Sequence, residues 1–259
     1  MHKPARKGTP HQQSKPVPPQ ETEAVFPMRV NKYLAMKGIA TRRDADVFVE
    51  KRKVFINDRV AQLGDKVLET DKVEIRGQER PKTYTYLAFN KPAGMDTHQE
   101  AKGEPNVLDS LPSDLQRLAL FPVGRLDKAS SGLLILTNDG RITDRLLNPK
   151  YAHEKTYDVT TKKPLRSSFK EKMEAGVDIE GYVTKPSKVE IVGADHFRVT
   201  LTEGKTHQVR RMVVALFNEV KSLRRTSIMG IRLGPVKLGG YRPIEGKELA
   251  KFLSDLGLA

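Results

Sequence analysis

The sequence predicts an α+β protein in which a small N-terminal α/β module precedes a larger domain built on a mixed, largely antiparallel sheet with flanking helices. The length supports two domains, because 259 residues exceed the roughly 100 to 150 of a usual single domain. A proline-containing linker at 78–82 separates two segments of different hydrophobic pattern. In the second segment, residues 83–259, short apolar runs do not alternate regularly with long helices, which disfavours a doubly wound parallel sheet.

Residues 1–27 are expected to form a disordered, basic tail. Six prolines fall in this stretch and large apolar side chains are few. Such a composition cannot bury enough surface to offset the entropy of ordering the chain. The first cations are followed by prolines and polar residues, and not by the apolar segment that a secretory signal requires.

The composition indicates a polyanionic partner. Lys and Arg number 46 against 32 Asp and Glu, a formal net charge of +14, and nucleic acid is the leading candidate. No membrane partner is expected, because no apolar run approaches the roughly 20 residues needed to span a bilayer. The absence of cysteine excludes disulfides and thiolate metal sites and fits a cytoplasmic protein.

Residues 28–77 are predicted to form a module of two short helices and a small sheet. An amphipathic helix over 30–36 is followed by a second helix, for which Thr41 and Asp44 take the positions of a capping box. A hairpin is predicted at 54–60, because Asn-Asp separates two apolar segments there. Val73 and Ile75 would add another strand.

The module also carries a candidate nucleic-acid-binding face. Two arginines, Arg42 and Arg43, fall in the first turn of the second helix, where cations oppose the helix dipole unless an anion such as phosphate is bound. An ordinary solvated basic surface is the alternative. The candidate contact residues of this face are Arg29, Lys32, Arg42, Arg43, Lys51, Arg52 and Lys53.

The elements of the larger domain follow from its apolar patterns. Strands are predicted at 84–89, 133–136, 156–159 and 197–201, and helices near 140–147 and 206–217. Thr206 is expected to cap the last of these helices. Its apolar stripe would be Val209, Met212, Val213 and Leu216, which leaves Arg210 and Arg211 off the stripe.

One carboxylate lies just before a predicted core strand. Asp127 precedes the apolar run at 133–136, and Gly124 and Gly132 allow the chain to turn tightly on both sides of it. The neighbouring Arg125 and Lys128 favour the ionised acid. A reactive carboxylate and a solvated turn aspartate both fit this local pattern.

Several segments, in this order, resemble the pseudouridine synthases that modify ribosomal RNA. The resemblance spans residues 28 to about 250 and includes Asn-Lys-Pro-x-Gly at 90–94, Gly-Arg-Leu-Asp at 124–127, Lys-Thr-Tyr at 155–157 and Glu-Gly-Lys-x-His-Gln-Val-Arg-Arg-Met at 203–212. A segment at 224–230 agrees as well. The module at 28–77 is similar to the small RNA-binding domain first recognised in a ribosomal small-subunit protein.

The resemblance implies a site and a reaction. Asp127 would be the essential carboxylate that converts a uridine to its carbon-glycoside isomer, either as nucleophile or as base toward the ribose. By the same resemblance Tyr157 would stack on the target base and accept the proton released from the newly bonded carbon, and Arg210 would pair with Asp127. No cofactor and no metal are implied.

The expected partner is a structured RNA stem-loop, whose target uridine must be extruded from its stack. Large-subunit ribosomal RNA is favoured, a transfer RNA is a further possibility, and the protein is expected to act as a monomer. Lys91, Arg125 and Arg211 are further candidate RNA contacts. Bracing of the Asp127 loop is the alternative for Arg125, and ordinary surface is the alternative for Arg211. Leu223 and Ile228 would line the pocket or pack in the core.

Two other functions stay open at this point. In a ribosome-assembly protein the module at 28–77 would be the function and the larger domain vestigial. An RNA methyltransferase could carry the same module, but no strand-linked Gly-x-Gly loop is present to hold a methyl donor. The histidines show no zinc-like spacing.

Overall fold

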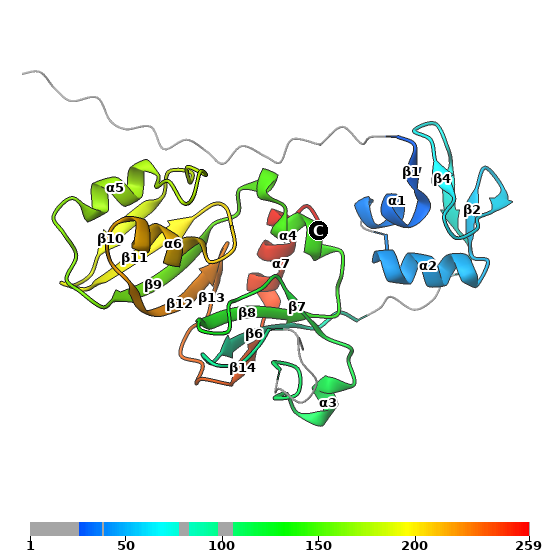
Figure 1. The fold of residues 1–259 in the computed structure, drawn as a ribbon. Helices are drawn as coiled ribbons and strands as arrows, with labels where there is room; N and C mark the ends of the chain where they lie inside the picture. Colours follow the sequence, from blue (N-terminus) through cyan, green and yellow to red (C-terminus); the bar gives the residue numbers. More distant parts are fainter. Residues whose placement is uncertain (1–25, 38, 78–82, 98–105, 259) are drawn as a thin grey trace, which may run out of the picture.

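The computed structural model describes residues 26–37, 39–77, 83–97 and 106–258, and it confirms the predicted α+β class (Figure 1). The tail predicted at 1–27, apart from its last two residues, and the linker predicted at 78–82 lie outside the described residues. Phe26 already packs against the N-terminal module, with its ring centroid 6.4 Å from that of Tyr33.

The N-terminal module holds two helices and two small sheets, with its core between them. The predicted hairpin is confirmed, and Asn57 and Asp58 at its turn both have positive φ, as a two-residue hairpin turn requires. A second, two-stranded sheet was not predicted, because two-residue strands carry no periodicity. The elements are β1 (Met28–Arg29), α1 (Val30–Met36), α2 (Arg42–Glu50), β2 (Val54–Ile56), β3 (Arg59–Val60), β4 (Lys66–Val67) and β5 (Val73–Ile75).

Thr41 begins α2 as the capping box predicts. Its Oγ1 accepts a hydrogen bond from the Asp44 amide at 3.0 Å and donates one to the Asp44 carboxylate at 2.9 Å. Asp44 therefore places a negative charge in the same first turn as Arg42 and Arg43. The helix compensates its own dipole, and a bound phosphate is not required to explain the two arginines.

The larger domain is organised around a nine-stranded mixed sheet. Its main path is β10-β11-β9-β12-β8-β6-β14, with β13 added to β12 and β7 added to β8. Among the strand pairs that the structure describes, only β8 and β12 run parallel. The strands are β6 (Tyr86–Lys91), β7 (Phe121–Val123), β8 (Ser131–Thr137), β9 (Lys155–Thr161), β10 (Lys188–Ile191), β11 (His196–Leu201), β12 (Val220–Ile228), β13 (Ile231–Arg232) and β14 (Tyr241–Pro243).

Helices cover this sheet in two groups. One core packs α4 and α7 against β6 and β8, and a second core packs α5 and α6 against β9, β11 and β12 (Figure 1). None of the described helices combines the length and the apolar character that a membrane crossing would need. The helices are α3 (Ser113–Gln116), α4 (Ile142–Leu147), a 3₁₀ turn (Pro149–Tyr151), α5 (Phe169–Ala175), α6 (Gln208–Ala215) and α7 (Gly246–Asp255).

Strand β8 is buried on both faces, which explains its continuous apolar sequence. Leu133 and Ile135 point into the core formed with α4 and α7. Leu134 and Leu136 point to the opposite face, where the segment 107–120 covers them. Asp127, the carboxylate predicted to precede a core strand, therefore lies just before a strand at the centre of the sheet.

The module contacts the larger domain beside α4. Arg145 donates from Nη2 to the carbonyl of Met36, at the end of α1, at 3.0 Å. The same guanidinium donates from Nη1 to the carbonyls of Leu256 and Gly257 at the end of α7. One arginine thus binds the carbonyl ends of two helices, one from each domain.

Candidate active site

The loop that carries Asp127 joins β7 to β8 and ends at the parallel pairing of β8 with β12. Strand register places Lys91, Gly132, Arg225 and Tyr157 in one row across β6, β8, β12 and β9. Residues opposed in neighbouring strands share a face of the sheet, and two strand spacings amount to roughly 10 Å. Tyr157 is therefore held on the sheet beside the end of the Asp127 loop.

The backbone of this loop is fixed by hydrogen bonds from distant elements. Every carbonyl from residue 125 to residue 129 accepts at least one. The donors are Arg225 Nη1 to Arg125 (3.3 Å), Thr97 Oγ1 to Leu126 (2.6 Å), the Ser130 amide to Asp127 (2.9 Å), the Gly94 amide to Lys128 (2.7 Å) and Arg210 Nη2 to Ala129 (3.0 Å). The Asp127 carboxylate, with a side chain 31% exposed, is thus displayed from a rigid turn.

Lys91 lies under this loop and is fully buried. Its ammonium donates to the carbonyls of Pro92 at 3.0 Å, Met95 at 2.6 Å and Lys128 at 3.4 Å. The prediction that Lys91 contacts RNA is therefore wrong, because its charge ties the 90–94 turn to the Asp127 loop and cannot reach solvent. Burial lowers the pKa of Lys91 to about 8, while the nearby carboxylates of Asp96 and Asp127 oppose that shift.

Because of this shift, stability should depend on pH through Lys91. The pKa of Lys91 is about 8 in the folded protein and near 10.5 in the unfolded chain, so the unfolded chain binds more protons between these values. Stability from this group therefore rises with pH. We expect the free energy of unfolding of the wild type, minus that of Lys91→Met, to rise on the order of 2 kcal/mol from pH 8 toward pH 10.5. Denaturant titrations at several pH values measure it, and a flat difference would contradict it.

Arg225 belongs to the segment 224–230, but the sequence pattern predicts no role for it. Its side chain is 4% exposed and donates from Nε to the carbonyl of Leu133 at 2.8 Å, in addition to the bond to Arg125. Its Nη2 and the Nε of Arg210 are buried and have no hydrogen-bond partner in the described part of the chain. These two N–H groups lie beside the Asp127 loop.

Arg210 approaches Asp127 but does not form the predicted ion pair in this structure. Its Nη2 donates to the Ala129 carbonyl and to Ser130 Oγ, at 3.0 and 3.1 Å. The basic atom recorded near the carboxylate is instead Nε2 of His207, 3.4 Å from Asp127 Oδ1. His207 belongs to the motif at 203–212, but the sequence pattern predicts no role for it.

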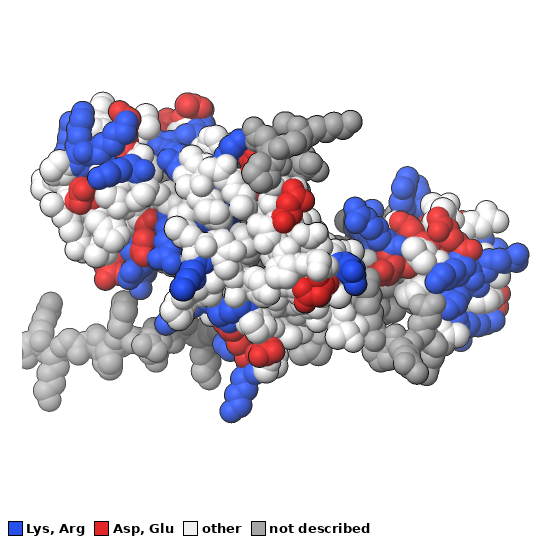
Figure 2. Space-filling view, turned by 90° about the horizontal axis from the view of Figure 1, so that it is seen from below, with Lys and Arg blue, Asp and Glu red and all other residues white. Residues whose placement is uncertain are grey.

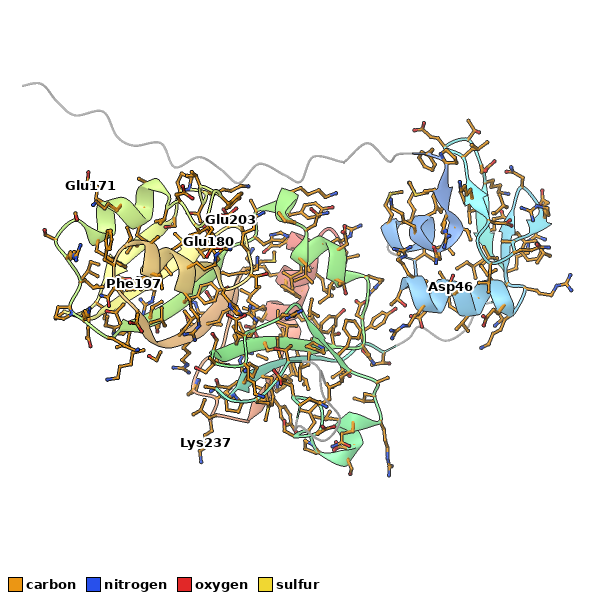
Figure 3. The ribbon with its side chains drawn as sticks, viewed as in Figure 1. Asp46, Glu171, Glu180, Phe197, Glu203 and Lys237 are labelled. Atoms are coloured by element: carbon orange, nitrogen blue, oxygen red, sulfur yellow. The ribbon has the colours of Figure 1, made fainter. Side chains whose placement is uncertain are left out.

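The start of α6 differs from the prediction. Thr206 is not the cap, because the helix begins at Gln208 and the preceding residue, His207, has φ of 52° and no capping side chain. The buried Gln208 side chain instead binds the segment before the helix: its Oε1 accepts from the Lys205 amide and its Nε2 donates to Glu203, both at 2.8 Å. Glu203 and Glu180, labelled in Figure 3, both contact residues of the first turn of this helix.

The other predicted site residues lie partly at the surface and partly in the interior. Arg211 donates to the Ile179 carbonyl at 2.8 Å and to the Glu180 carboxylate at 2.7 Å, so it braces a neighbouring loop. Arg125 is exposed on the Asp127 loop. Leu223 and Ile228 are 5% and 2% exposed and belong to the two cores, as ordinary packing predicts.

The candidate RNA-binding cations of the module are at its surface. Figure 2 shows Lys and Arg side chains, interspersed with Asp and Glu, over this part of the molecule. Lys53 is half-buried, and the exposed members are Arg29, Lys32, Arg42, Arg43, Lys51 and Arg52. Their accessibility is what a phosphate-binding role requires.

The geometry defines a class of site: a carboxylate on a rigid strand-end loop, with an aromatic ring and buried cations beside it. Comparison with known proteins agrees with the resemblance seen in the sequence. The family model for RNA pseudouridylate synthase matches residues 85–215, and the S4 domain model matches residues 28–73.

Individual relatives extend this match over most of the chain. Dual-specificity RNA pseudouridine synthase RluF of Escherichia coli K12 is 39% identical over 226 residues, covering 86% of this chain and 77% of that protein. Ribosomal large subunit pseudouridine synthase B of Bacillus subtilis is 34% identical over 243 residues, covering 88% and 98%. A crystal structure of a pseudouridylate synthase superposes with a TM-score of 0.64 at 29% identity, covering 88% of this chain and 99% of that one.

The chain belongs to the RNA pseudouridylate synthase family and carries an S4 domain at its N-terminus. It is an isomerase that converts uridine to pseudouridine in RNA. The family match favours this activity over the methyltransferase considered from the sequence.

Proposed function

We propose that this protein modifies a uridine in a stem-loop of large-subunit ribosomal RNA, with Asp127 as the essential carboxylate. The observation that carries the proposal is the Asp127 loop, whose carbonyls are all bonded and which presents a partly exposed carboxylate beside Tyr157. The target class follows from a relative named as a large-subunit enzyme. A transfer RNA, the further possibility considered from the sequence, is the second candidate substrate. Such a substrate places the protein in the cytoplasm, where it acts as a monomer.

The chemistry requires a carboxylate that reaches the ribose. Breaking the bond between the base and the ribose leaves an electron-poor sugar, which a carboxylate assists as a nucleophile or as a base. Both routes need an ionised oxygen with access to the nucleotide. Asp127 meets this need because its side chain projects from the loop, while backbone carbonyls and not its carboxylate take the hydrogen bonds of Arg210, Arg225 and Thr97.

Tyr157 supplies a surface for the freed base. Its ring is half-buried at the edge of the core formed with α5 and α6, so its position is fixed by packing. A flat ring with a polar end can stack on uracil while the base turns, and its hydroxyl can take the proton from the carbon that has bonded to the ribose.

Arg210 acts on the same loop from α6. Its guanidinium binds Ala129 and Ser130, two and three residues after Asp127. When a nucleotide covers the site and excludes water, this nearby positive charge stabilises the ionised carboxylate.

The S4 domain binds the RNA backbone around the target. Extruding a stacked base costs a few kcal/mol, and contacts to neighbouring phosphates offset this cost. The exposed cations at both ends of α2 supply such contacts. Since Arg145 links the end of α1 to the larger domain, these contacts are made at a set distance from Asp127.

Charge reversal at the start of α2 should weaken this binding. We expect Arg42→Glu with Arg43→Glu to lower RNA affinity roughly 10-fold or more at low salt and to reduce the slope of log K against log salt, because two phosphate contacts are lost. Filter binding at several salt concentrations measures both. Lys170→Glu with Lys172→Glu on α5, also exposed, is the matched control and should leave the slope unchanged. Equal slopes for both variants would remove the phosphate role of Arg42 and Arg43.

Mapping of pseudouridine identifies the target. Total RNA from a strain with the gene and a strain without it is treated with carbodiimide, and the adducts that stop reverse transcription are compared. The proposal expects one site in large-subunit ribosomal RNA to disappear and to return with the wild-type gene. A site lost only from transfer or small-subunit RNA would overturn the assigned substrate.

A further inference from the structure

We infer that His207 positions the Asp127 carboxylate, an inference that rests on the role proposed for Asp127. Nε2 of His207 lies 3.4 Å from Asp127 Oδ1. In the described part of the chain, no other basic side chain comes within ion-pair distance of this carboxylate. The other cations at the loop, Lys91, Arg210 and Arg225, direct their N–H groups to backbone carbonyls instead.

The backbone at His207 is unfavourable for a residue with a side chain. Its φ of 52° and ψ of 27° lie in the left-handed region, which glycine adopts without steric cost. The histidine does not cap α6, because its side chain makes no capping hydrogen bond. Since neither the backbone nor the helix start calls for histidine here, its recorded contact with Asp127 is what explains it.

A buried network holds this strained residue in place. Glu203, 4% exposed, accepts from Tyr182 Oη at 2.6 Å, from the Lys185 amide at 3.0 Å and from Gln208 at 2.8 Å. Gln208 in turn accepts from the Lys205 amide. Lys205 and Gln208, which flank His207 at one residue before Thr206 and directly after His207, are therefore anchored. The imidazole lies at the Asp127 loop.

The position of the imidazole gives it a specific task. The contact of Nε2 with Oδ1, at 3.4 Å, restrains the Asp127 side chain and leaves Oδ2 for the ribose. The His207 side chain is 57% exposed, so it is accessible to a bound RNA, as Asp127 is. Exclusion of water by such an RNA would strengthen the interaction between the two groups.

The other charged groups around this pair come from every element packed on the loop. Burial lowers the pKa of Lys91 to about 8. Burial also lowers the pKa of Lys155. The full set comprises Lys91 from β6, Lys155 from β9, Arg210 from α6, Arg225 from β12, and Asp96, Arg125 and Lys128 from the loops.

The variant His207→Gly distinguishes the positioning of Asp127 from a purely structural role of His207. Glycine removes the imidazole and also relieves the left-handed backbone, so we expect a melting temperature equal to or above that of the wild type. Phe217→Gly is the matched control, because Phe217 follows the other end of α6, has φ of 62° and is 72% exposed. Both variants remove an exposed ring at a positive φ, but only one removes a neighbour of Asp127.

One kinetic readout follows. Under single-turnover conditions with the mapped RNA, His207→Gly should lower the rate constant about 10-fold with little change in RNA affinity. Phe217→Gly should match the wild type in both rate and affinity. A normal rate in His207→Gly would overturn the inference.

A measurement without RNA keeps the test independent of activity. In the proton–nitrogen NMR spectrum of the full chain, the imidazole signals of His207 should shift when Asp127 is replaced by Asn, while those of His153 and His196 stay in place. Unshifted His207 signals would sink the inference even if Asp127→Asn is inactive and the proposed function stands. Conversely, an active Asp127→Asn enzyme would overturn the proposed function whatever the His207 signals do.

Discussion

Asp127→Asn should abolish pseudouridine formation and leave RNA binding intact. Asparagine has the shape of aspartate but cannot act as a nucleophile or as a base toward the ribose. The loop should keep its conformation, because the Asp127 side chain contributes none of the hydrogen bonds that hold carbonyls 125–129. Loss of an essential catalytic carboxylate lowers the rate roughly 10⁴-fold or more.

The measurement is a single-turnover assay read by carbodiimide mapping, together with filter binding of the same RNA. Asp96→Asn is the matched control, since Asp96 is a second carboxylate at this loop, 3.4 Å from Lys128 Nζ and 18% exposed. It should retain most of the activity. Product from Asp127→Asn at the wild-type rate would refute the role of Asp127. A wild-type protein that binds RNA but forms no product would instead support the assembly function left open by the sequence.

Local sequence patterns predicted the elements whose caps, turns or apolar runs lie within the element itself. The second helix of the S4 domain follows from Thr41 and Asp44, and the hairpin follows from Asn57 and Asp58, because caps and turns are decided within a few residues. Strand β8 follows from its apolar run, although it begins at Ser131, two residues before the predicted start. Very short strands such as β1, β4 and β13 were missed because two residues cannot display a period.

Local sequence patterns could not predict how the residues of the site are arranged. Asp127 and Tyr157 could be nominated from the resemblance, but the partners of the loop come from positions 91, 97, 210 and 225, which meet only once the sheet order is known. A lysine or arginine in a basic protein looks like a surface residue. Lys91 and Arg225 are instead buried, and nothing in their neighbouring residues distinguishes them from the exposed cations of the S4 domain.

A second large effect, a loss of stability, is expected for Gly132→Ala. Gly132 lies in the row of paired residues that crosses β6, β8, β12 and β9. Gly132 has φ of +106°, and a Cβ there would lie 2.2 Å from the carbonyl oxygen and 2.7 Å from the amide nitrogen of Arg225. Both are backbone atoms of β12, so the clash cannot be relieved by rotating a side chain. We expect a destabilisation of about 2 to 4 kcal/mol. For a protein of this size that corresponds to a fall in melting temperature of roughly 5 to 15 °C.

Gly181→Ala isolates the cause of that loss. Gly181 also has a positive φ, +85°, but a Cβ there would meet nothing within 4 Å. This control carries only the backbone cost of about 1 kcal/mol, so its melting temperature should stay well above that of Gly132→Ala. Similar melting temperatures for the two variants would show that β8 and β12 are not in close contact at Gly132.

Gly132→Ala should also lower the rate of the reaction. Gly132 lies between Lys91 and Arg225 in the row that leads to Tyr157, so any separation of β8 from β12 moves the Tyr157 ring away from the Asp127 loop. A displacement of about 1 Å between reacting groups can lower a rate on the order of 100-fold. Single-turnover assays below the melting temperature of Gly132→Ala should therefore show a slow enzyme, whereas Gly181→Ala at the same temperature should react at the wild-type rate. A folded Gly132→Ala enzyme with the wild-type rate would mean that the spacing of these two strands does not set the geometry of the reaction.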